Sequence, residues 1–172
     1  MKKHIVSISA ICKEGKFAKY QYTENALYIF SAWSVYRLEK DEISETELKK
    51  AGFVGFYSHG MTADYDRMQT NDPRLYKKPL ECVHIPDKSI SERRVYKQNS
   101  KYIGIDFRLA KPYANRIASI YAARMNFGKA PVMCFDKDGK FLCSIMPYYV
   151  NQDDCKNRFD TKITYLHGKE SA

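Results

Sequence analysis

The dipeptide Asp138-Gly139, which lies between two short apolar runs, is the feature that most constrains how this chain folds. An Asp-Gly pair favours a two-residue turn between antiparallel strands, because that turn needs backbone angles that these residues tolerate. The flanking runs at 131–135 and 141–146 are therefore predicted to pair as a β-hairpin. The fold is accordingly expected to contain antiparallel sheet.

The five cysteines indicate a reducing compartment. They are odd in number and irregularly spaced, at Cys12, Cys82, Cys134, Cys143 and Cys155. A secreted disulfide framework is therefore not expected, and we predict a cytoplasmic protein. Counting outward from the Asp138-Gly139 turn places Cys134 opposite Cys143, where a disulfide would fit in an oxidising environment. Two reduced thiols in the core are the favoured interpretation, because free cysteine packs like a small hydrophobe.

Local patterns predict the other strands and helices. Alternation of β-branched or aromatic residues with polar ones predicts strands at 4–12, 17–22, 53–57, 82–85, 102–107 and 161–166. The Ser-x-x-Glu spacing of a capping box predicts short helices at 44–51 and 89–98. The longest helix is expected over 112–126, since Pro112 suits a first helical turn and Gly128 lies just past the end. Residues 26–38 fit either a helix or a strand, and we favour the helix.

Together these elements predict a single-domain α+β protein. Its largely antiparallel sheet, which contains two hairpins, is expected to pack against two to four helices, with helix 112–126 across it. The 172 residues suit one domain over 1–166, followed by a flexible tail at 167–172. With 44% hydrophobic and 28% charged residues, the composition excludes a disordered chain. No window approaches the roughly 18 apolar residues of a membrane span, so we expect a soluble protein that does not enter a membrane.

Positive charge is concentrated in one part of the chain. The sequence has 29 Lys and Arg against 20 Asp and Glu, a formal net charge of +9. Residues 88–129 contain ten basic side chains against only Glu92 and Asp106, a local balance of +8. Aromatic residues are interleaved with them, namely Tyr96, Tyr102, Phe107, Tyr113, Tyr121 and Phe127. Because guanidinium groups bind phosphates and exposed aromatic rings stack on bases, this segment indicates a nucleic-acid surface.

Our first hypothesis is therefore a small basic intracellular protein that binds DNA or RNA and catalyses no reaction. Phosphates would be contacted by Arg93, Arg94, Lys97, Arg108, Lys111 and Arg116, and Tyr96 or Tyr113 would stack on bases. Arg124 falls in the apolar stripe of the expected helix 112–126, where it either binds the last helix carbonyls or contacts a phosphate. The alternative is a protein-interaction module or inhibitor whose basic face docks on an acidic protein surface.

An enzymatic function has weaker support in the sequence. The motifs of phosphate loops, dinucleotide-binding folds, serine hydrolases and zinc proteases are absent. Cys82-Val-His84 is a weak zinc signal without a second ligand pair, so we predict no metal and no cofactor. The long polar segment 58–79 contains His59, Asp64 and Asp66, which would be the catalytic residues of a metal-dependent nuclease, our third hypothesis.

Overall fold

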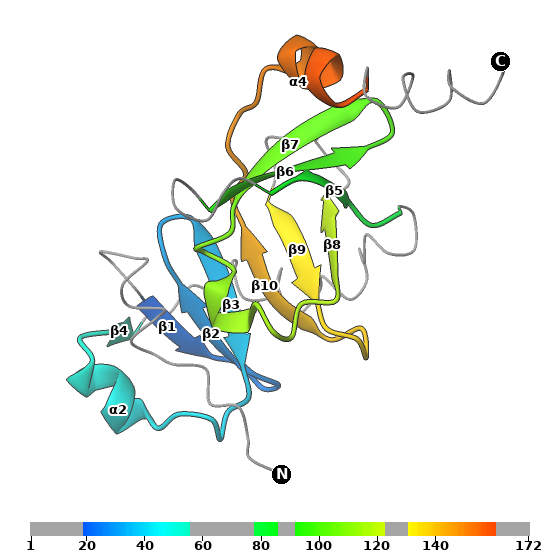
Figure 1. Cartoon of the computed structure of the whole chain (residues 1–172). Coiled ribbons are helices and arrows are strands. Elements are labelled where there is room, and N and C mark those ends of the chain that lie inside the picture. The colour runs from blue at the N-terminus through cyan, green and yellow to red at the C-terminus, as the bar shows by residue number, and fades with distance from the viewer. Residues whose placement is uncertain (1–18, 56–77, 86–91, 123–130, 161–172) are drawn as a thin grey trace, which may run out of the picture.

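The computed structural model describes residues 19–55, 78–85, 92–122 and 131–160, which form two β-sheets (Figure 1). The larger sheet has the strand order β4-β1-β2-β3-β10-β9-β8. Its strands are β1 (Lys19–Tyr22), β2 (Leu27–Phe30), β3 (Ser34–Leu38), β4 (Val54–Gly55), β8 (Ser119–Ala122), β9 (Val132–Phe135) and β10 (Phe141–Ile145). All neighbouring strands in this sheet are antiparallel except β4 and β1, which are parallel.

The smaller sheet consists of three antiparallel strands, β5 (Glu81–His84), β6 (Arg93–Gln98) and β7 (Lys101–Asp106). A two-residue turn at Asn99 and Ser100 joins β6 to β7. Asn99 has a positive φ of 54°, a conformation that asparagine adopts more readily than most residues. The hairpin therefore forms without a glycine in its turn.

Two backbone hydrogen bonds join the sheets. Leu80, just before β5, donates its N–H to the carbonyl of Ile120 in β8 (2.7 Å). Tyr148, in the chain that leaves β10, donates to the carbonyl of Gly104 in the middle of β7 (2.9 Å). The smaller sheet is thus held across the ends of β8 and β10, as Figure 1 shows.

The main hydrophobic core lies between the two sheets. From the smaller sheet it takes Tyr96, Ile103 and Ile105, which are at most 5% exposed. From the larger sheet it takes residues such as Ile29 and Leu142. Because side chains alternate along a strand, the neighbours of Tyr96 and Ile105 point to the opposite, outer face of the smaller sheet. The positions of the charged residues of β6 and β7 follow from this alternation.

The helices are few and short, so the expectation of a sheet packed against two to four helices is wrong. The described ranges contain two α-helices, α2 (Glu45–Lys50) and α4 (Gln152–Phe159), and a 3₁₀ helix, η2 (Lys111–Tyr113). The core of the larger sheet is built mainly from strand residues, and the described helices add only single side chains to it, such as Leu48 of α2 and Tyr113 of η2. The described part of the protein is mainly β-sheet, and none of its helices is long and apolar enough to span a membrane.

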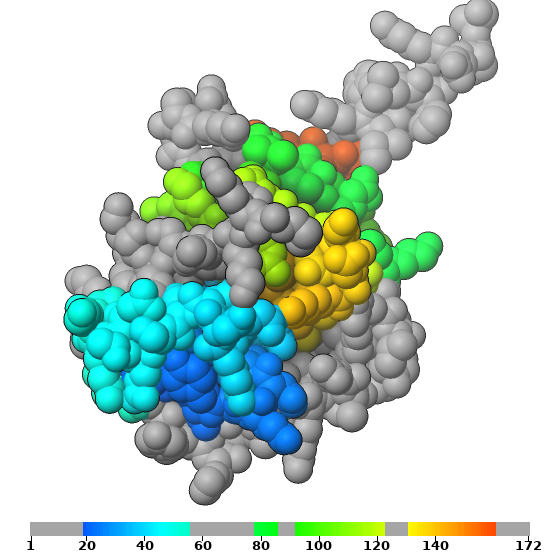
Figure 2. Space-filling model, turned by 90° about the horizontal axis from the view of Figure 1, so that it is seen from below, coloured from blue at the N-terminus to red at the C-terminus, as the bar shows by residue number. Residues whose placement is uncertain are grey.

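The short helix predicted at 44–51 is confirmed as α2. The Ser44 hydroxyl accepts from the Glu47 N–H, and the Glu47 carboxylate accepts from the Ser44 N–H, which completes the capping box. Leu48 is the buried residue of this helix, and Tyr20 of β1 donates to Glu45 (3.1 Å). These contacts pack α2 against the β1 and β2 end of the larger sheet, as Figure 2 shows from below.

The helix α4 was not among the elements predicted from the sequence. Asn151 caps this helix by accepting from the N–H groups of Asp153 and Asp154. Cys155 and Phe159 of α4 pack on the outer face of the smaller sheet, against Tyr102. The smaller sheet is therefore covered on its outer side by α4 and on its inner side by the larger sheet.

The helix predicted over 112–126 is wrong. The 3₁₀ helix η2 begins at Lys111 and is followed by turns and then by β8, while residues 123–126 lie outside the described residues. In β8, Ile120 and Ala122 are buried and Ser119 and Tyr121 are half-buried, and this alternation has the period of a strand. Every residue of β8 pairs with a residue of β9, and this pairing outweighs the helical spacing of the apolar residues in the segment.

Two other segments expected to be helical, 26–38 and 89–98, also contain strands where the structure describes them. Residues 26–38 form the β2–β3 hairpin rather than the favoured helix, because Ser31 and Ser34 close a tight turn at its centre. The helix expected at 89–98 is wrong where it is described, since Arg93–Gln98 is the central strand of the smaller sheet. Residues 26–38 are rich in aromatic and β-branched residues, which suit strands, and β6 is held as a strand by its pairing with β5 on one side and β7 on the other.

The hairpin predicted around Asp138-Gly139 is confirmed, and Cys134 lies opposite Cys143 in β9 and β10. The predicted two-residue turn is wrong, because Phe135 and not Asp136 lies opposite Phe141, and a register shift between Phe141 and Cys143 restores the pairing of the cysteines. The turn is closed by the Asp136 N–H on the Lys140 carbonyl (3.0 Å), and a bulge follows it. Both thiols are free and buried. A hydrogen bond with Cys134, together with burial, raises the pKa of the Cys143 thiol well above its ordinary value, so it stays protonated.

Strands predicted at 82–85 and 102–107 are confirmed as β5 and β7. The strand predicted at 53–57 is described only as β4, and the one at 17–22 only from Lys19 onward, as β1. The strands predicted at 4–12 and 161–166, and the tail 167–172, lie outside the described residues.

Candidate functional site

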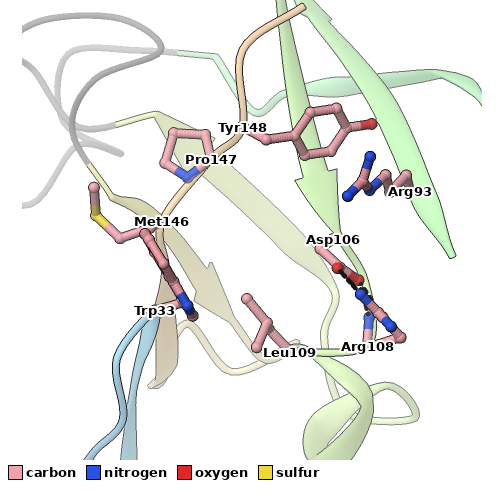
Figure 3. Close-up of a pocket in the computed structure, with 8 residues that line it drawn as sticks. All are labelled: Trp33, Arg93, Asp106, Arg108, Leu109, Met146, Pro147 and Tyr148. Carbon is pink, nitrogen blue, oxygen red and sulfur yellow. Dashed lines mark hydrogen bonds and ion pairs between the residues drawn. The ribbon is translucent and has the colours of Figure 1, made fainter. Parts of the chain in front are cut away.

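A cleft with a volume of about 410 Å³ opens where the two sheets meet (Figure 3). Its residues come from the β2–β3 turn, the ends of β6 and β7, the turns after β7 and the chain that leaves β10. They are Trp33, Arg93, Asp106, Arg108, Leu109, Met146, Pro147 and Tyr148. Trp33 and Met146 lie on one side of this cleft, and the charged residues lie on the opposite side.

The aromatic side of the cleft is built on the β2–β3 turn. The Ser31 hydroxyl accepts from the N–H groups of Trp33 (3.4 Å) and Ser34 (3.1 Å), which holds the turn in shape. The Met146 N–H donates to the Trp33 carbonyl (2.8 Å), so the two side chains stay next to each other. Trp33 is 61% exposed, which is unusual for an indole with so much apolar surface and leaves one face available for contact.

The charged side of the cleft is an arginine-carboxylate cluster. Arg93 and Asp106 are opposite each other in the β6–β7 register. The Arg108 side chain donates three hydrogen bonds to Asp106, from Nε to Oδ1 (2.9 Å) and Oδ2 (3.2 Å) and from Nη2 to Oδ2 (2.5 Å). The Arg108 hydrogen bonds hold the pKa of Asp106 below its ordinary value, and the charge of Arg93 lowers it further. Two positive charges therefore face one carboxylate.

The turns after β7 hold Arg108 and Leu109 in position. Leu109 and Ala110 donate their N–H groups to carbonyls three residues earlier, at Asp106 and Phe107. Tyr36 of β3 donates its hydroxyl to the Leu109 carbonyl (2.8 Å). The arginine side of the cleft is therefore anchored to the larger sheet and does not depend on a free loop.

Tyr148 closes the cleft at its upper end in Figure 3. Its ring covers Gly104 so closely that a Cβ atom there would overlap ring atoms Cε2 and Cζ. The Arg93 guanidinium lies 5.3 Å from the centre of the same ring, a cation–π contact. Gly104 is thus the residue that lets Tyr148 reach the sheet and orient Arg93.

Arg93 and Arg108 are the two predicted phosphate-binding residues that the structure brings together in the cleft. Arg94 points to the inner face and its guanidinium lies 3.4 Å from the centre of the Phe107 ring. Lys97 forms an ion pair with Asp160 (2.5 Å), which also accepts from the Tyr102 hydroxyl. The basic residues of β6 therefore diverge onto two faces.

The remaining predicted residues lie away from the cleft lining. Lys111 is 3.8 Å from Glu92 and exposed, and Arg116 is 4.0 Å from Asp136. The two predicted stacking rings are buried: burial raises the pKa of Tyr96 to about 12, and Tyr113 donates its hydroxyl to the Arg37 carbonyl. Four predicted site residues lie outside the described residues, namely Arg124, His59, Asp64 and Asp66.

Sequence reasoning did not single out Trp33, Tyr148 or Asp106. A single tryptophan between two serines, in Ser31-Ala-Trp-Ser34, is a signal for an exposed aromatic residue in a turn. Asp106 was counted only as an acidic residue of the basic segment, although its spacing from Arg108 permits a local ion pair. Nothing near Tyr148 in the sequence indicates that its ring covers Gly104.

The described residues do not support a metal site. No group of three or more His, Cys, Asp or Glu side chains gathers within the described ranges. The Cys82 thiol donates to the carbonyl of His84 (3.7 Å), and a bulge separates the two residues in β5.

No model of a known protein family matches this chain, and no curated protein matches it.

Proposed function

We propose that this protein binds nucleic acid as a single strand at the cleft between its two sheets. Arg93 and Arg108 bind phosphate oxygens, and Trp33 stacks on a base. The proposal rests on one observation: an exposed indole faces two guanidinium groups around the same cleft. Base stacking requires an unpaired base, which favours a single strand over a duplex.

The charge around the cleft supports this proposal. Its lining residues include two arginines and one aspartate, so their formal charge is positive. Lys111, with a side chain that is 67% exposed, lies outside the lining three residues after Arg108, and Glu92 at 3.8 Å offsets part of its positive charge. The +9 net charge of the whole chain attracts a polyanion over a longer range. We place this function in the cytoplasm, a location supported by the free thiols of all four described cysteines.

Fluorescence anisotropy of labelled oligonucleotides tests the proposal. Single-stranded and duplex DNA and RNA of equal length are titrated at two salt concentrations. We expect tighter binding of single strands and an affinity that falls by about tenfold or more between low and physiological salt. Absence of binding at low salt would overturn the proposal.

A pair of variants assigns the binding to the cleft. The double substitution Arg93→Gln with Arg108→Gln removes both guanidinium groups, and we expect it to weaken binding by about tenfold or more. Lys101→Gln with Lys50→Gln is the matched control, because it also removes two exposed positive charges, one in α2 and one at the other end of β7, about 17 Å along the strand from Asp106. Equal losses in the two variants would show general charge attraction and contradict a site at the cleft.

A further inference from the structure

We propose that the cleft binds a single nucleotide through its terminal phosphate monoester and its base. This inference rests on the proposed function and names the part of the nucleic acid that enters the cleft. The ligand is a free nucleoside monophosphate or the 5′-phosphorylated end of a strand, since the two present the same chemical groups.

The size of the cleft suits one nucleotide. Pockets for small ligands have volumes of about 300–1,000 Å³, and this cleft, at about 410 Å³, lies near the lower limit. Eight of the described residues bound it, including Tyr148, whose ring is packed on Gly104 and closes one end. A run of several stacked bases needs a longer groove than this.

The charged side of the cleft suits a phosphate monoester. Arg93 and Arg108 act on the same Asp106 carboxylate, so their positive charges converge on one region. A phosphate monoester carries a charge of about −1.5 to −2 at pH 7, whereas a phosphodiester within a strand carries about −1. Two converging guanidinium groups therefore favour the terminal phosphate.

Asp106 has two opposing effects on such a ligand. Its hydrogen bonds with Arg108 hold the guanidinium in place. Its negative charge also repels a phosphate that approaches the same two arginines. Replacing the carboxylate by a neutral amide of the same shape keeps an acceptor for Arg108 and removes the repulsion. Asp106→Asn is therefore expected to tighten binding, a gain that misfolding would not produce.

The aromatic side of the cleft suits the base. Trp33 has an exposed ring, and Met146 and Pro147 extend the apolar surface beside it. This surface faces the arginines from across the cleft. A nucleotide separates its two ends in the same way, because the sugar holds the flat base apart from the charged phosphate.

Fluorescence of Trp33 tests this inference directly, because it is the single tryptophan of the chain. Nucleoside 5′-monophosphates, the corresponding nucleosides and inorganic phosphate are titrated separately, and calorimetry confirms each affinity. We expect the affinity for nucleoside monophosphates to be at least about tenfold higher than the affinity for the nucleosides or for inorganic phosphate. Asp106→Asn should tighten this binding by about threefold and Arg108→Gln should weaken it by about tenfold, while Lys101→Gln leaves it unchanged.

Oligonucleotides with a 5′-phosphate or a 5′-hydroxyl separate the two sources of ligand. A preference for the phosphorylated end, with a change in Trp33 emission, supports a strand end; a monophosphate that binds more tightly than either oligonucleotide supports a free nucleotide. If both oligonucleotides bind equally and monophosphates do not bind, the nucleotide site is overturned and the proposed function stands. If monophosphates bind and neither oligonucleotide does, the nucleotide site stands and single-strand binding is overturned.

Discussion

The two faces of the β6–β7 hairpin differ in chemistry and in what they contact, although their side chains alternate along the same twelve strand residues, six in β6 and six in β7. The inner face presents Tyr96, Ile103 and Ile105 to the core between the sheets. The outer face presents Arg93 and Asp106 to the cleft and the bare backbone of Gly104 to Tyr148. It also presents Lys97 and Tyr102 to Asp160, the residue that follows α4.

This contrast shows why the basic segment does not form one continuous patch. Side chains of a strand alternate between faces, so adjacent Arg93 and Arg94 lie on opposite sides of the sheet. Arg94 stacks on Phe107 at the inner side, whereas Arg93 reaches the cleft. We expect substitutions on the inner face to change stability and substitutions at the cleft to change binding.

The largest effect on stability is expected on the inner face, from Ile105→Ala. Ile105 is fully buried, and removing three carbon atoms leaves a cavity in a close-packed core, at a cost of about 2–5 kcal/mol. Chemical denaturation measures the loss, and Lys101→Gln, at an exposed position on the same strand, is the control. A loss below about 1 kcal/mol would contradict the close packing of this face.

The next largest effect is expected from Gly104→Ala, on the outer face. The new methyl group would overlap the Tyr148 ring, which must move away from the sheet. We expect a cost of about 1–3 kcal/mol from this overpacking, together with weaker ligand binding because Arg93 loses its contact with the ring.

A double-mutant cycle with Tyr148→Ala tests the cause of that effect. If the ring is the obstacle, Gly104→Ala costs less in the Tyr148→Ala background than in the natural protein. Strictly additive losses would show that the methyl group and the ring do not interact.

A smaller effect, confined to acidic pH, is expected from Asp160→Asn. Hydrogen bonds from Lys97 and then from Tyr102 hold the pKa of Asp160 below its ordinary value. Because the pKa of Asp160 is lower in the folded protein than in the unfolded protein, its charged form stabilises the fold at any pH above the unfolded pKa of about 3.9. This stabilisation is lost as the pH falls through the pKa of the folded protein. Thermal unfolding across a pH series should show that the unfolding midpoint falls less steeply with decreasing pH in the variant than in the natural protein. An unchanged slope would contradict a role for this cluster in docking α4.

The smallest effect on stability is expected from Arg108→Gln at the cleft. The Arg108 side chain is 57% exposed, and an exposed ion pair contributes about 0–1 kcal/mol after screening by solvent. Its unfolding midpoint should therefore match that of Lys101→Gln, while its affinity for single strands falls. If Arg108→Gln lowered stability clearly and left affinity unchanged, the assignment of Arg108 to binding and not to stability would be wrong.

Local signals predicted those elements whose determinants lie within a few residues. The capping box at Ser44 and Glu47 satisfies the N–H groups of its own helix, so α2 forms as predicted. The Asp-Gly turn likewise brings β9 and β10 together. The segment 111–122 lacks such a determinant. Its apolar residues have helical spacing, but it forms β8 because it pairs with β9. This pairing cannot be predicted from the residues of the segment alone.

The candidate site was predicted only in part for the same reason. Clustering of positive charge in 88–129 is a property of the sequence, and this segment contains Arg93 and Arg108, which line the cleft. Trp33 and Tyr148 lie about 60 and 55 residues from Arg93 in the chain, and only strand pairing brings them to the cleft.

The sequence by itself determined the local turns, the capped helix α2, the excess of positive charge and the segment that carries it. These properties depend on neighbouring residues or on composition, so they need no knowledge of distant partners. Only the tertiary structure decided which face each basic residue occupies, and it placed a tryptophan opposite two arginines. The physical reason is that strand register and sheet pairing set both outcomes, and these depend on hydrogen bonds between segments far apart in the chain.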